Sequence, residues 1–566
     1  TFPGGPLNGI YTRYFVEEAW LLHVILVVAI GLANALPLAR LASGGGLLTI
    51  LLAIVILMIA PMKNDTLMFA PAFMMVLVKI GNGSKPDGGL TALVMLVGAA
   101  GILAKFSTLP IVVFAALSLD VVSFSRRQWP LASAMLGLFL MLLMAAAHQN
   151  PMDVAALLRS GIELSSFYSA AMSIPGRVIE LAGWLSFAAA LFTMAVTGLW
   201  DLLRQKRVNA IEFAISILAF ALFLFLNFKA GFVRHDQHSL IAWGGLAVAA
   251  LAWICLERTW LSCSSRTLAA AAIAIAAVVV PNALIQRRPF PELAAQPREK
   301  LEAIQSQTFQ FVSIVSNPGI WLRDQIARQS QARTAIRTVT AYPRIDGPID
   351  MIPSNQSELI AHGFEYRPRP TIQEYATYSP LLIARNRAFF EGERAPQHIL
   401  MRPGSIDYRH PASAEGSLWS LFLSSYEPVA SIGDMVQLTR RRSPLTEIIG
   451  PESSIVARFR ELIPLPPGDA PILLKARIER QLIGRLLDIA LKPPIVTMYA
   501  TYSDGQEVPY RVIPGMISEG MIVSPLVESS ADYVLLAAGR MGAPKWRRPV
   551  SIRFESGFLG ATAYQR

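Results

Sequence analysis

Residues 213–226 read FAISILAFALFLFL and residues 239–256 read SLIAWGGLAVAALAWICL, and the charged stretch KAGFVRHDQH separates them at 229–238. Neither apolar run contains an acidic or basic side chain. With their flanks, at 209–228 and 237–256, the runs match the hydrocarbon thickness that a helix crosses with its backbone hydrogen bonds satisfied internally. They predict two membrane-spanning helices joined by a short polar loop.

The composition extends this prediction to the first half of the chain. Hydrophobic residues make up 53% and charged residues 16% of the 566 residues, whereas a soluble protein carries roughly a quarter of its residues as charges. The deficit lies before Arg287. The ten predicted spans are 19–40, 46–62, 65–81, 89–105, 108–123, 129–148, 177–199, 209–228, 237–256 and 267–285. The second to fifth of these spans are short and closely spaced, and one of them could be re-entrant.

Basic loops set the expected orientation. Arg126-Arg127 and the cluster at 204–207 predict cytoplasmic loops, which places 149–176, 229–236 and everything after about 285 outside. Residues 1–18 also fall outside without an initiator Met, so an earlier span is expected upstream of Thr1. The chain has two cysteines, and its outer half has none. This pattern favours a bacterial inner membrane with a periplasmic C-terminal region.

The predicted fold class is a polytopic α-helical membrane domain followed by a periplasmic α/β domain and a C-terminal β-sandwich resembling a jelly roll. The α/β domain is indicated by strands at 349–352 and 398–401 and a helix at 380–391. The β-sandwich is indicated by strands at 495–502, 533–538 and 550–555. The predicted boundaries are 1–285 for the transmembrane domain, 286–345 for a helical membrane-proximal linker, 346–445 for the α/β domain and 446–566 for the β-sandwich.

The loop at 229–238 is the main candidate for chemistry. Charged groups at a bilayer edge are costly unless they reach water or a partner. Lys229 and Arg234 suit phosphate binding, whereas His235, Asp236 and His238 suit proton transfer or metal binding. The alternative is an interfacial loop whose charges only mark the membrane surface.

Two further stretches are weaker candidates. The outer loop 149–176 predicts an interfacial amphipathic helix, or, as the stronger alternative, a plain surface helix. Asp153 also lies in this loop, and its candidate substrate contacts are Arg159, Glu163 and Tyr168. The Pro-rich stretch 366–370 with the tyrosines that follow it predicts a sugar- or phosphate-contacting rim, or equally a contact that pins the soluble domain to the membrane half. The residues of this second stretch are Arg367, Arg369, Tyr375 and Tyr378.

The net charge of +11 does not require nucleic acid as a partner, because cytoplasmic loops of a membrane protein are basic. The outer arginines 323, 328, 333 and 337 read either as a solvated face or as a site for anionic lipid or a phosphorylated substrate. Common catalytic signatures are absent from the sequence: it has no phosphate-loop motif, no HExxH, no GxSxG and no CxxC.

The arrangement resembles the integral-membrane glycosyltransferases of the GT-C fold. The likeness in architecture covers nearly the whole chain. The likeness in motifs covers Gly5-Pro6-Leu7, the loop 229–238 and the stretch 366–370 with 375–378. The resemblance implies transfer of a sugar from a polyprenyl-phosphate donor to a lipid or polysaccharide acceptor, with a divalent metal ion as an optional cofactor. It implies Asp236 and His235 as catalytic residues, and the other candidates above as substrate contacts.

One departure from the family concerns the catalytic acid. GT-C enzymes place it in the first outer loop, where this sequence offers only Glu17 and Glu18. Either the acid lies upstream of Thr1, or another residue such as Asp236 takes its role. Two other classes stay open: a non-catalytic accessory or assembly subunit of a membrane complex, and a transporter, for which no internal repeat is visible.

Overall fold

The structure is a computed structural model that describes residues 16–43, 46–81, 87–260, 265–284, 290–446, 450, 452–540, 546–557 and 560–564. The stretch Gly5-Pro6-Leu7 and Cys263 lie outside the described residues. The described chain forms two compact units. The helical unit comprises Gly4–Arg159 and Ile174–Ile326, and the sheet unit comprises Ser160–Ser173 and Ala327–Arg566.

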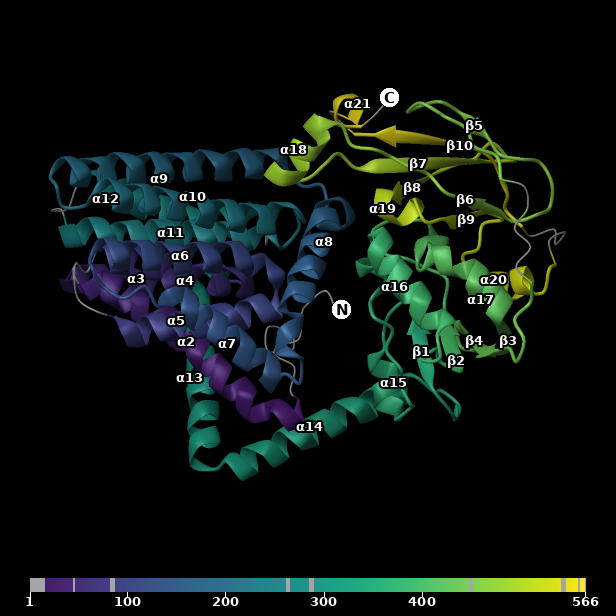
Figure 1. Ribbon diagram of the computed structural model, residues 1–566, viewed down its shortest axis with the longest axis horizontal. Helices are drawn as coiled ribbons and strands as arrows, with labels where there is room; N and C mark the ends of the chain where they lie inside the picture. The colour runs from purple at the N-terminus through teal and green to yellow at the C-terminus, as the bar shows by residue number, and fades with distance from the viewer. Residues whose placement is uncertain are drawn as a thin grey trace. The chain divides into compact units, whose positions relative to one another are not determined.

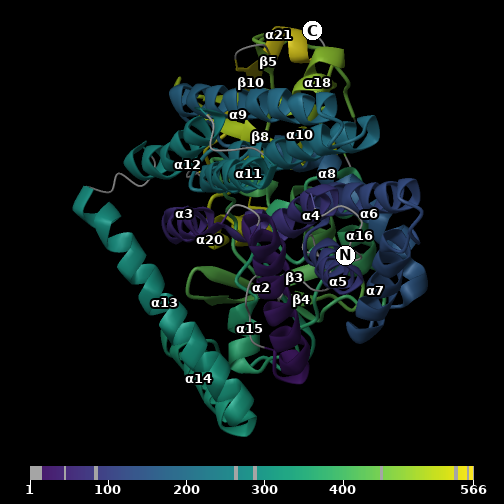
Figure 2. The ribbon, with the colours of Figure 1, turned by 90° about the vertical axis from the view of Figure 1, so that its left-hand side faces the viewer.

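Every one of the ten predicted spans coincides with a helix of the helical unit. Helices α9, α10 and α11 run alongside one another (Figure 1), and α13 leaves the bundle (Figure 2). The helices are α2 (Trp20–Ser43), α3 (Gly46–Ile59), α4 (Asn64–Gly81), α5 (Gly88–Ala104), α6 (Leu109–Ser125), α7 (Ala132–Ala146), α9 (Val178–Arg204), α10 (Ala210–Phe232), α11 (Ser239–Trp260), α12 (Ser265–Leu284) and α13 (Phe290–Ser316).

Seven helical stretches in the described residues are long and apolar enough to cross a membrane. They correspond to α2, α4, α6, α9, α10, α11 and α12. The apolar helices α3, α5 and α7 are shorter, with 14, 17 and 15 residues. The expectation that the second to fifth spans are short holds for α3 and α5. The third and fifth spans, α4 and α6, are long enough to cross, and the short α7 is the sixth span. Which side of a membrane either end faces stays a prediction.

The interior of the bundle depends on close approach at two glycines of α11. A Cβ at Gly244 would lie 2.7 Å from the carbonyl oxygen of Pro61, and a Cβ at Gly245 would lie 2.3 Å from Cγ of Asn227. The buried Asn227 accepts a 3.0 Å hydrogen bond from Thr66 Oγ1. Small residues thus let α11 pack against α4 and α10 closely enough for buried polar groups to pair.

Ion pairs fasten the end of the bundle that carries the predicted cytoplasmic loops. Arg126 forms a 2.7 Å ion pair with Glu212 and donates a 2.7 Å bond to the carbonyl of Lys79. Arg266 pairs with Asp201 at 2.8 Å and with the buried Glu257 at 3.2 Å. These arginines therefore tie several helices together at this end.

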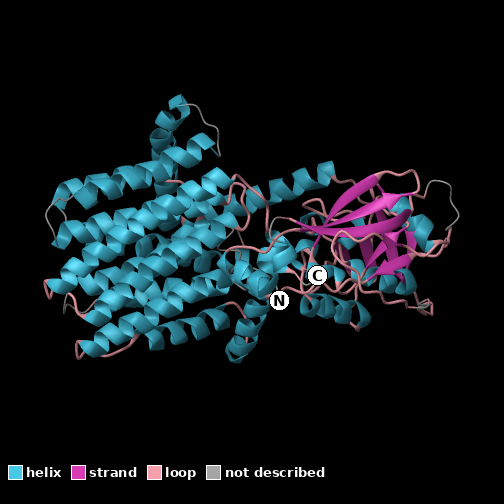
Figure 3. Ribbon diagram, turned by 90° about the horizontal axis from the view of Figure 1, so that it is seen from above, coloured by secondary structure: helices cyan, strands magenta, loops and turns pink. Residues whose placement is uncertain are grey.

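The sheet unit contains the described strands (Figure 3). Its first sheet has the order β1-β2-β4-β3, with β1 parallel to β2 and the other pairs antiparallel. The strands are β1 (Ile349–Ile352), β2 (His398–Met401), β3 (Tyr426–Ile432) and β4 (Met435–Arg440). The helices of this part are α14 (Pro318–Val339), which begins in the helical unit, α15 (Ser357–His362), α16 (Pro380–Glu391) and α17 (Trp419–Ser425). The predicted strands at 349–352 and 398–401 and the helix at 380–391 are confirmed.

One strand prediction is wrong. Tyr533–Ala538 falls mainly within a helix, α20 (Ser530–Ala537). The side chain of Ser529 accepts from the backbone of Asp532, and the Asp532 side chain accepts from the backbone of Ser529. This capping box starts a helix, and its local signal outweighs the apolar run that suggested a strand. Tyr533 and Leu536 join the core of the first sheet.

The remaining strands form two small sheets, of order β5-β10-β7-β8 and β6-β9. They share one core with the short helices α18 (Leu482–Ala490) and α21 (Gly560–Ala563) nearby. In the described residues these six strands are fewer than the eight of a jelly roll. The strands are β5 (Ile463–Pro464), β6 (Ile472–Leu474), β7 (Val496–Tyr502), β8 (Glu507–Val512), β9 (Met521–Ser524) and β10 (Pro549–Ser556).

The seat of α18 gives a test of this packing. A Cβ at Gly484 would lie 2.1 Å from the carbonyl oxygen of Ala563, and backbone cannot yield as a side chain can. We expect Gly484→Ala to lower the free energy of unfolding by about 1–3 kcal/mol, although alanine favours helix. The measurement is thermal unfolding of the full chain in detergent. The control, Arg485→Ala on the exposed side of α18, should leave the midpoint unchanged; equal effects would contradict this packing.

Candidate functional site

The polar loop between α10 and α11 is shorter than predicted. Helix α10 continues to Phe232, so Lys229 lies in its last turn, half-buried, and the loop runs from Val233 to His238. The backbone of Val233 donates to the Lys229 carbonyl at 3.2 Å. The cation of Lys229 therefore belongs to a helix end, where the helix dipole favours positive charge.

Asp236 is the centre of the loop. One of its carboxylate oxygens accepts a 2.6 Å hydrogen bond from His238 Nδ1 and a 3.0 Å bond from the His238 backbone. Its other oxygen pairs with Arg234 Nε at 3.0 Å. The side chain of His238 is 50% exposed. With Nδ1 donating to the carboxylate, the tautomer assigned from this geometry leaves Nε2 of this half-exposed ring as a proton acceptor.

Two opposing effects set the charge of Asp236. Partial burial raises the pKa of its carboxyl, but the hydrogen bonds from His238 and the charges of His238 and Arg234 lower it by more. The net result is a pKa below the usual range. Asp236 is thus an anion that orients His238 at neutral pH.

A second carboxylate–histidine pair lies beside the first and is buried. His235 Nε2 is 3.1 Å from Glu180 Oε2, and Trp243 Nε1 donates to Glu180 Oε1 at 3.1 Å. The side chains of His235 and Glu180 are 6% and 5% exposed. The ring of His235 meets Phe232 edge-on, with centroids 4.8 Å apart. The neighbouring histidines 235 and 238 therefore have different environments, one enclosed and one open.

The segment before α9 holds His235 in place. Ile174 accepts from the backbone of His235 at 3.3 Å and donates to the carbonyl of Val233 at 3.1 Å. A Cβ on Gly176 would lie 2.1 Å from the His235 ring. Glycine is needed here because the imidazole packs directly against the backbone.

The sequence prediction did not include Glu180 or Trp243. Glu180 stands one turn inside an apolar run that was assigned as a span, and an ionisable residue inside a span usually has a specific partner. The position of an acidic residue inside a predicted span is therefore a sequence signal that could have identified Glu180 as a site residue. It does not identify His235, which lies 55 residues further along the chain.

The other candidates fall in the sheet unit, except Arg159, which is exposed on α8 (Val154–Met172) in the part assigned to the helical unit. The C-terminal part of α8 packs with Tyr375 and Tyr378 around Leu382 and Met516. The hydroxyl of Tyr378 donates to the Leu164 carbonyl at 3.1 Å. Burial raises the pKa of Tyr378, and the nearby groups Tyr168 and Glu163 add to the rise. The structure thus brings these four predicted side chains together.

The two predicted arginines of the Pro-rich stretch have different environments. Arg367 is partly exposed and pairs with Glu365 at 3.0 Å. Arg369 is buried, which differs from the expected surface rim. It pairs with Asp350 at 2.7 Å and with Glu415 at 3.1 Å, and all three side chains are inaccessible to solvent. Arg369 therefore organises the interior of the sheet unit.

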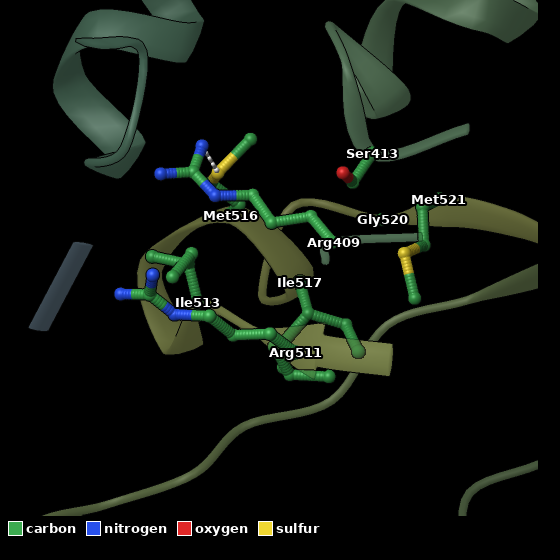
Figure 4. A pocket seen from close by; sticks show the side chains of 9 residues that line it. Arg409, Ser413, Arg511, Ile513, Met516, Ile517, Gly520 and Met521 are labelled. Carbon is green, nitrogen blue, oxygen red and sulfur yellow. Dashed lines mark hydrogen bonds between the residues drawn. The ribbon is translucent and has the colours of Figure 1, made fainter. Parts of the chain in front are cut away.

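A small cavity lies near this interior. Figure 4 shows the guanidinium groups of Arg409 and Arg511 on one side of it and the hydroxyl of Ser413 above. Arg409 donates to the carbonyl of Ala171 at 3.1 Å, and Arg511 donates to the same carbonyl at 2.8 Å. The space holds about one water-sized molecule. The two arginines thus cap the end of α8 from within the sheet unit.

Two titratable groups of this interior have shifted pKa values. Burial raises the pKa of Glu374 to about 7, with Arg409 opposing and Glu415 adding to the rise. Burial lowers the pKa of His410 to about 4. Glu374 is therefore protonated up to neutral pH, and His410 is uncharged.

Comparisons with protein-family models, with curated proteins and with solved structures return no match for this chain. Within the described residues, no group of three or more His, Cys, Asp or Glu side chains is arranged to hold a metal ion. The site is thus defined by its own geometry: two carboxylate–histidine pairs at one end of a bundle of apolar helices.

The buried pair predicts unequal effects for two tryptophans of α11. Trp243 donates to the Glu180 carboxylate, whereas Trp253 Nε1 is buried without a hydrogen-bond partner in the described structure. Both substitutions to Phe remove similar volume. We expect Trp243→Phe to destabilise by about 1.5–3 kcal/mol more than Trp253→Phe, because only the first removes a bond to a charged group. Thermal unfolding in detergent measures the difference, and equal midpoints would contradict the assigned bond.

Glu374 predicts a pH dependence of stability. The folded chain keeps this proton up to about pH 7, whereas the unfolded chain loses it near 4.5. Its contribution is fully present below pH 4.5 and is lost as pH rises to 7, at about 1.4 kcal/mol per pH unit. We expect Glu374→Gln to unfold later than wild type at pH 8 and to lose this advantage at pH 4.5.

The control for this prediction is Glu393→Gln, which changes an exposed acid of the same unit. Its unfolding midpoint should follow wild type across the pH range. His410 is present in all three proteins, so its opposite pH dependence cancels in the comparison. Parallel profiles for Glu374→Gln and wild type would disprove the raised pKa.

Proposed function

We propose that the protein is a membrane glycosyltransferase that moves a sugar from a polyprenyl-phosphate donor to a lipid or polysaccharide acceptor at the outer face of a bacterial inner membrane. The observation that carries the proposal is the Asp236–His238 pair, in which a carboxylate orients a half-exposed imidazole. It lies in a loop between two helices long enough to span a membrane. A donor with its tail in the bilayer presents its reactive carbon at such a level.

In this proposal His238 acts as the general base. Asp236 accepts a hydrogen bond from Nδ1–H of His238 and so fixes the tautomer of the ring. Nε2 of His238 accepts the proton of the acceptor hydroxyl while the hydroxyl oxygen attacks the anomeric carbon of the sugar. The bond from that carbon to the phosphate oxygen breaks, and its electron pair leaves with the polyprenyl phosphate. Asp236 stabilises the imidazolium that forms.

The cations have a second role. Arg234 positions Asp236 through its Nε contact, and the charges of Arg234 and Lys229 favour the negative charge that develops on the leaving phosphate. The buried pair of Glu180 and His235 keeps the loop in shape, and we assign it positioning, since both side chains are enclosed. No step of this mechanism requires a metal ion.

The sheet unit is proposed as the acceptor-holding part. Its partly exposed Arg367, with Tyr168, Glu163 and Tyr375, offers ring faces and polar groups that bind sugars. The buried Tyr378 supports this cluster from below and does not contact a sugar. A periplasmic location of this unit follows from the expected orientation and is part of the proposal.

The test is transfer of labelled sugar from a panel of polyprenyl-phosphate donors in membranes that contain the full-length protein. We expect Asp236→Asn and His238→Gln each to reduce transfer about 10²–10⁴-fold through loss of the general base. The matched control is Asp153→Asn, which changes an exposed acid in the turn Pro151–Asp153. It should retain wild-type transfer, and thermal unfolding should show that all variants are folded.

Each other outcome rejects a defined part of the proposal. Transfer that survives Asp236→Asn and His238→Gln would move the chemistry away from this loop. Absence of transfer with every donor, with acceptor membranes supplied, would favour the non-catalytic accessory class.

A further inference from the structure

Helix α18 of the sheet unit turns its apolar side outward. Leu482, Ile483, Leu486 and Ile489 are 72%, 48%, 55% and 65% exposed. Their spacing of one, four and seven residues places them on one face of the helix. An ordinary surface helix of a soluble domain presents polar residues to water and buries such a face.

The opposite side of α18 is the one that meets the protein. Gly484 lies against the carbonyl of Ala563, and Leu487 packs against the core of β7, β8 and β10. Asp488 forms an ion pair with Arg480. The outward orientation is therefore fixed, because glycine is the residue that permits the close contact on the inner side. Rotation of the helix to bury its leucines would break that contact.

The chain around α18 is basic. Residues 475–492 contain five basic residues, Lys475, Arg477, Arg480, Arg485 and Lys492, against the two acids Glu479 and Asp488, so the segment carries a charge of +3. Arg485 is exposed beside the apolar face. An apolar stripe bordered by basic side chains is the pattern of helices that lie in the interface of anionic bilayers.

We propose that α18 is a membrane-surface anchor whose occupant is an anionic lipid bilayer. The four aliphatic side chains would insert below the headgroups, and the exposed Arg485 would contact lipid phosphates. Seven helical stretches of the same chain are long and apolar enough to cross a membrane. Because the sheet unit is part of this chain, helices that cross a bilayer would keep it near the bilayer surface. The proposal rests on the chain being a membrane protein and not on sugar transfer.

The test uses the full chain reconstituted in vesicles, with Cys255→Ala and Cys263→Ser as background. Single cysteines replace Leu486 on α18 or, as a control, Val429 on β3, which is 52% exposed in the same unit. Each carries a polarity-sensitive fluorophore. Vesicles contain phosphatidylcholine with or without phosphatidylglycerol. Quenching is measured with a nitroxide on the lipid acyl chain and with iodide in water.

We expect the acyl-chain nitroxide to quench the label at position 486 severalfold more than the label at 429, and iodide to quench it less. The difference should shrink without phosphatidylglycerol and in the Arg485→Glu variant. Iodide quenching equal at both positions would show that α18 faces water and would overturn the proposal. Protection from iodide without nitroxide quenching would also overturn it, because protein, from this chain or a second copy, would then cover the helix. A thermal unfolding midpoint of Leu486→Cys equal to that of wild type will show that the substitution leaves the fold intact.

Discussion

A carboxylate inside an apolar helix bundle has to be paired, and the pairing of Glu180 is the contact on which the candidate site depends. Transfer of an unpaired charge into such an environment costs several kcal/mol or more. Glu180 avoids this cost through Trp243 on one oxygen and His235 on the other. Its two partners belong to α11 and to the loop before it, so one buried anion fixes the helices and the loop together. The more exposed pair of Asp236 and His238 lies in the same loop as His235, so the contacts of Glu180 also position this pair.

The sheet unit also contains a buried charge that has to be paired, and there the central group is a cation with carboxylate partners. Arg369 is the buried cation, and all its nitrogens donate to partners: to Asp350, to Glu415 and to carbonyls of Met351, Pro353 and Thr371. An exposed ion pair such as Arg367 with Glu365 contributes about 0–1 kcal/mol. Removal of one partner from a buried pair costs about 3–5 kcal/mol. Burial, more than residue type, therefore separates the roles of the two neighbouring arginines.

The sequence predicted what local patterns determine. Apolar runs located ten of the described helices of the helical unit because each run carries its own hydropathy signal. The end of α10 was placed too early, since Lys229 was taken as loop although a cation is favourable in the last turn of a helix. The helix at Tyr533 was missed because an apolar run was weighed above the Ser529–Asp532 capping box. Glu180 and Arg369 were beyond local patterns, because their roles depend on partners that are distant in sequence. The proximity of Tyr168 and Glu163 to Tyr375 and Tyr378 likewise exists only in the folded chain.

Chain connectivity gives α8 a particular place in this scheme. Its residues from Ser160 onward group with the sheet unit, where arginines 409 and 511 hold its last carbonyls. Ser173 is the last residue of that group, and Ile174 is the first residue of the helical unit that follows. Ile174 in turn bonds to the backbone of Val233 and His235. The segment that shapes the candidate loop is therefore covalently continuous with a helix that the sheet unit holds. From the Ala171 carbonyl that the arginines hold, three peptide bonds lead to Ile174, and one backbone hydrogen bond joins Ile174 to His235. The two features are thus linked through the main chain and need no relay of side chains.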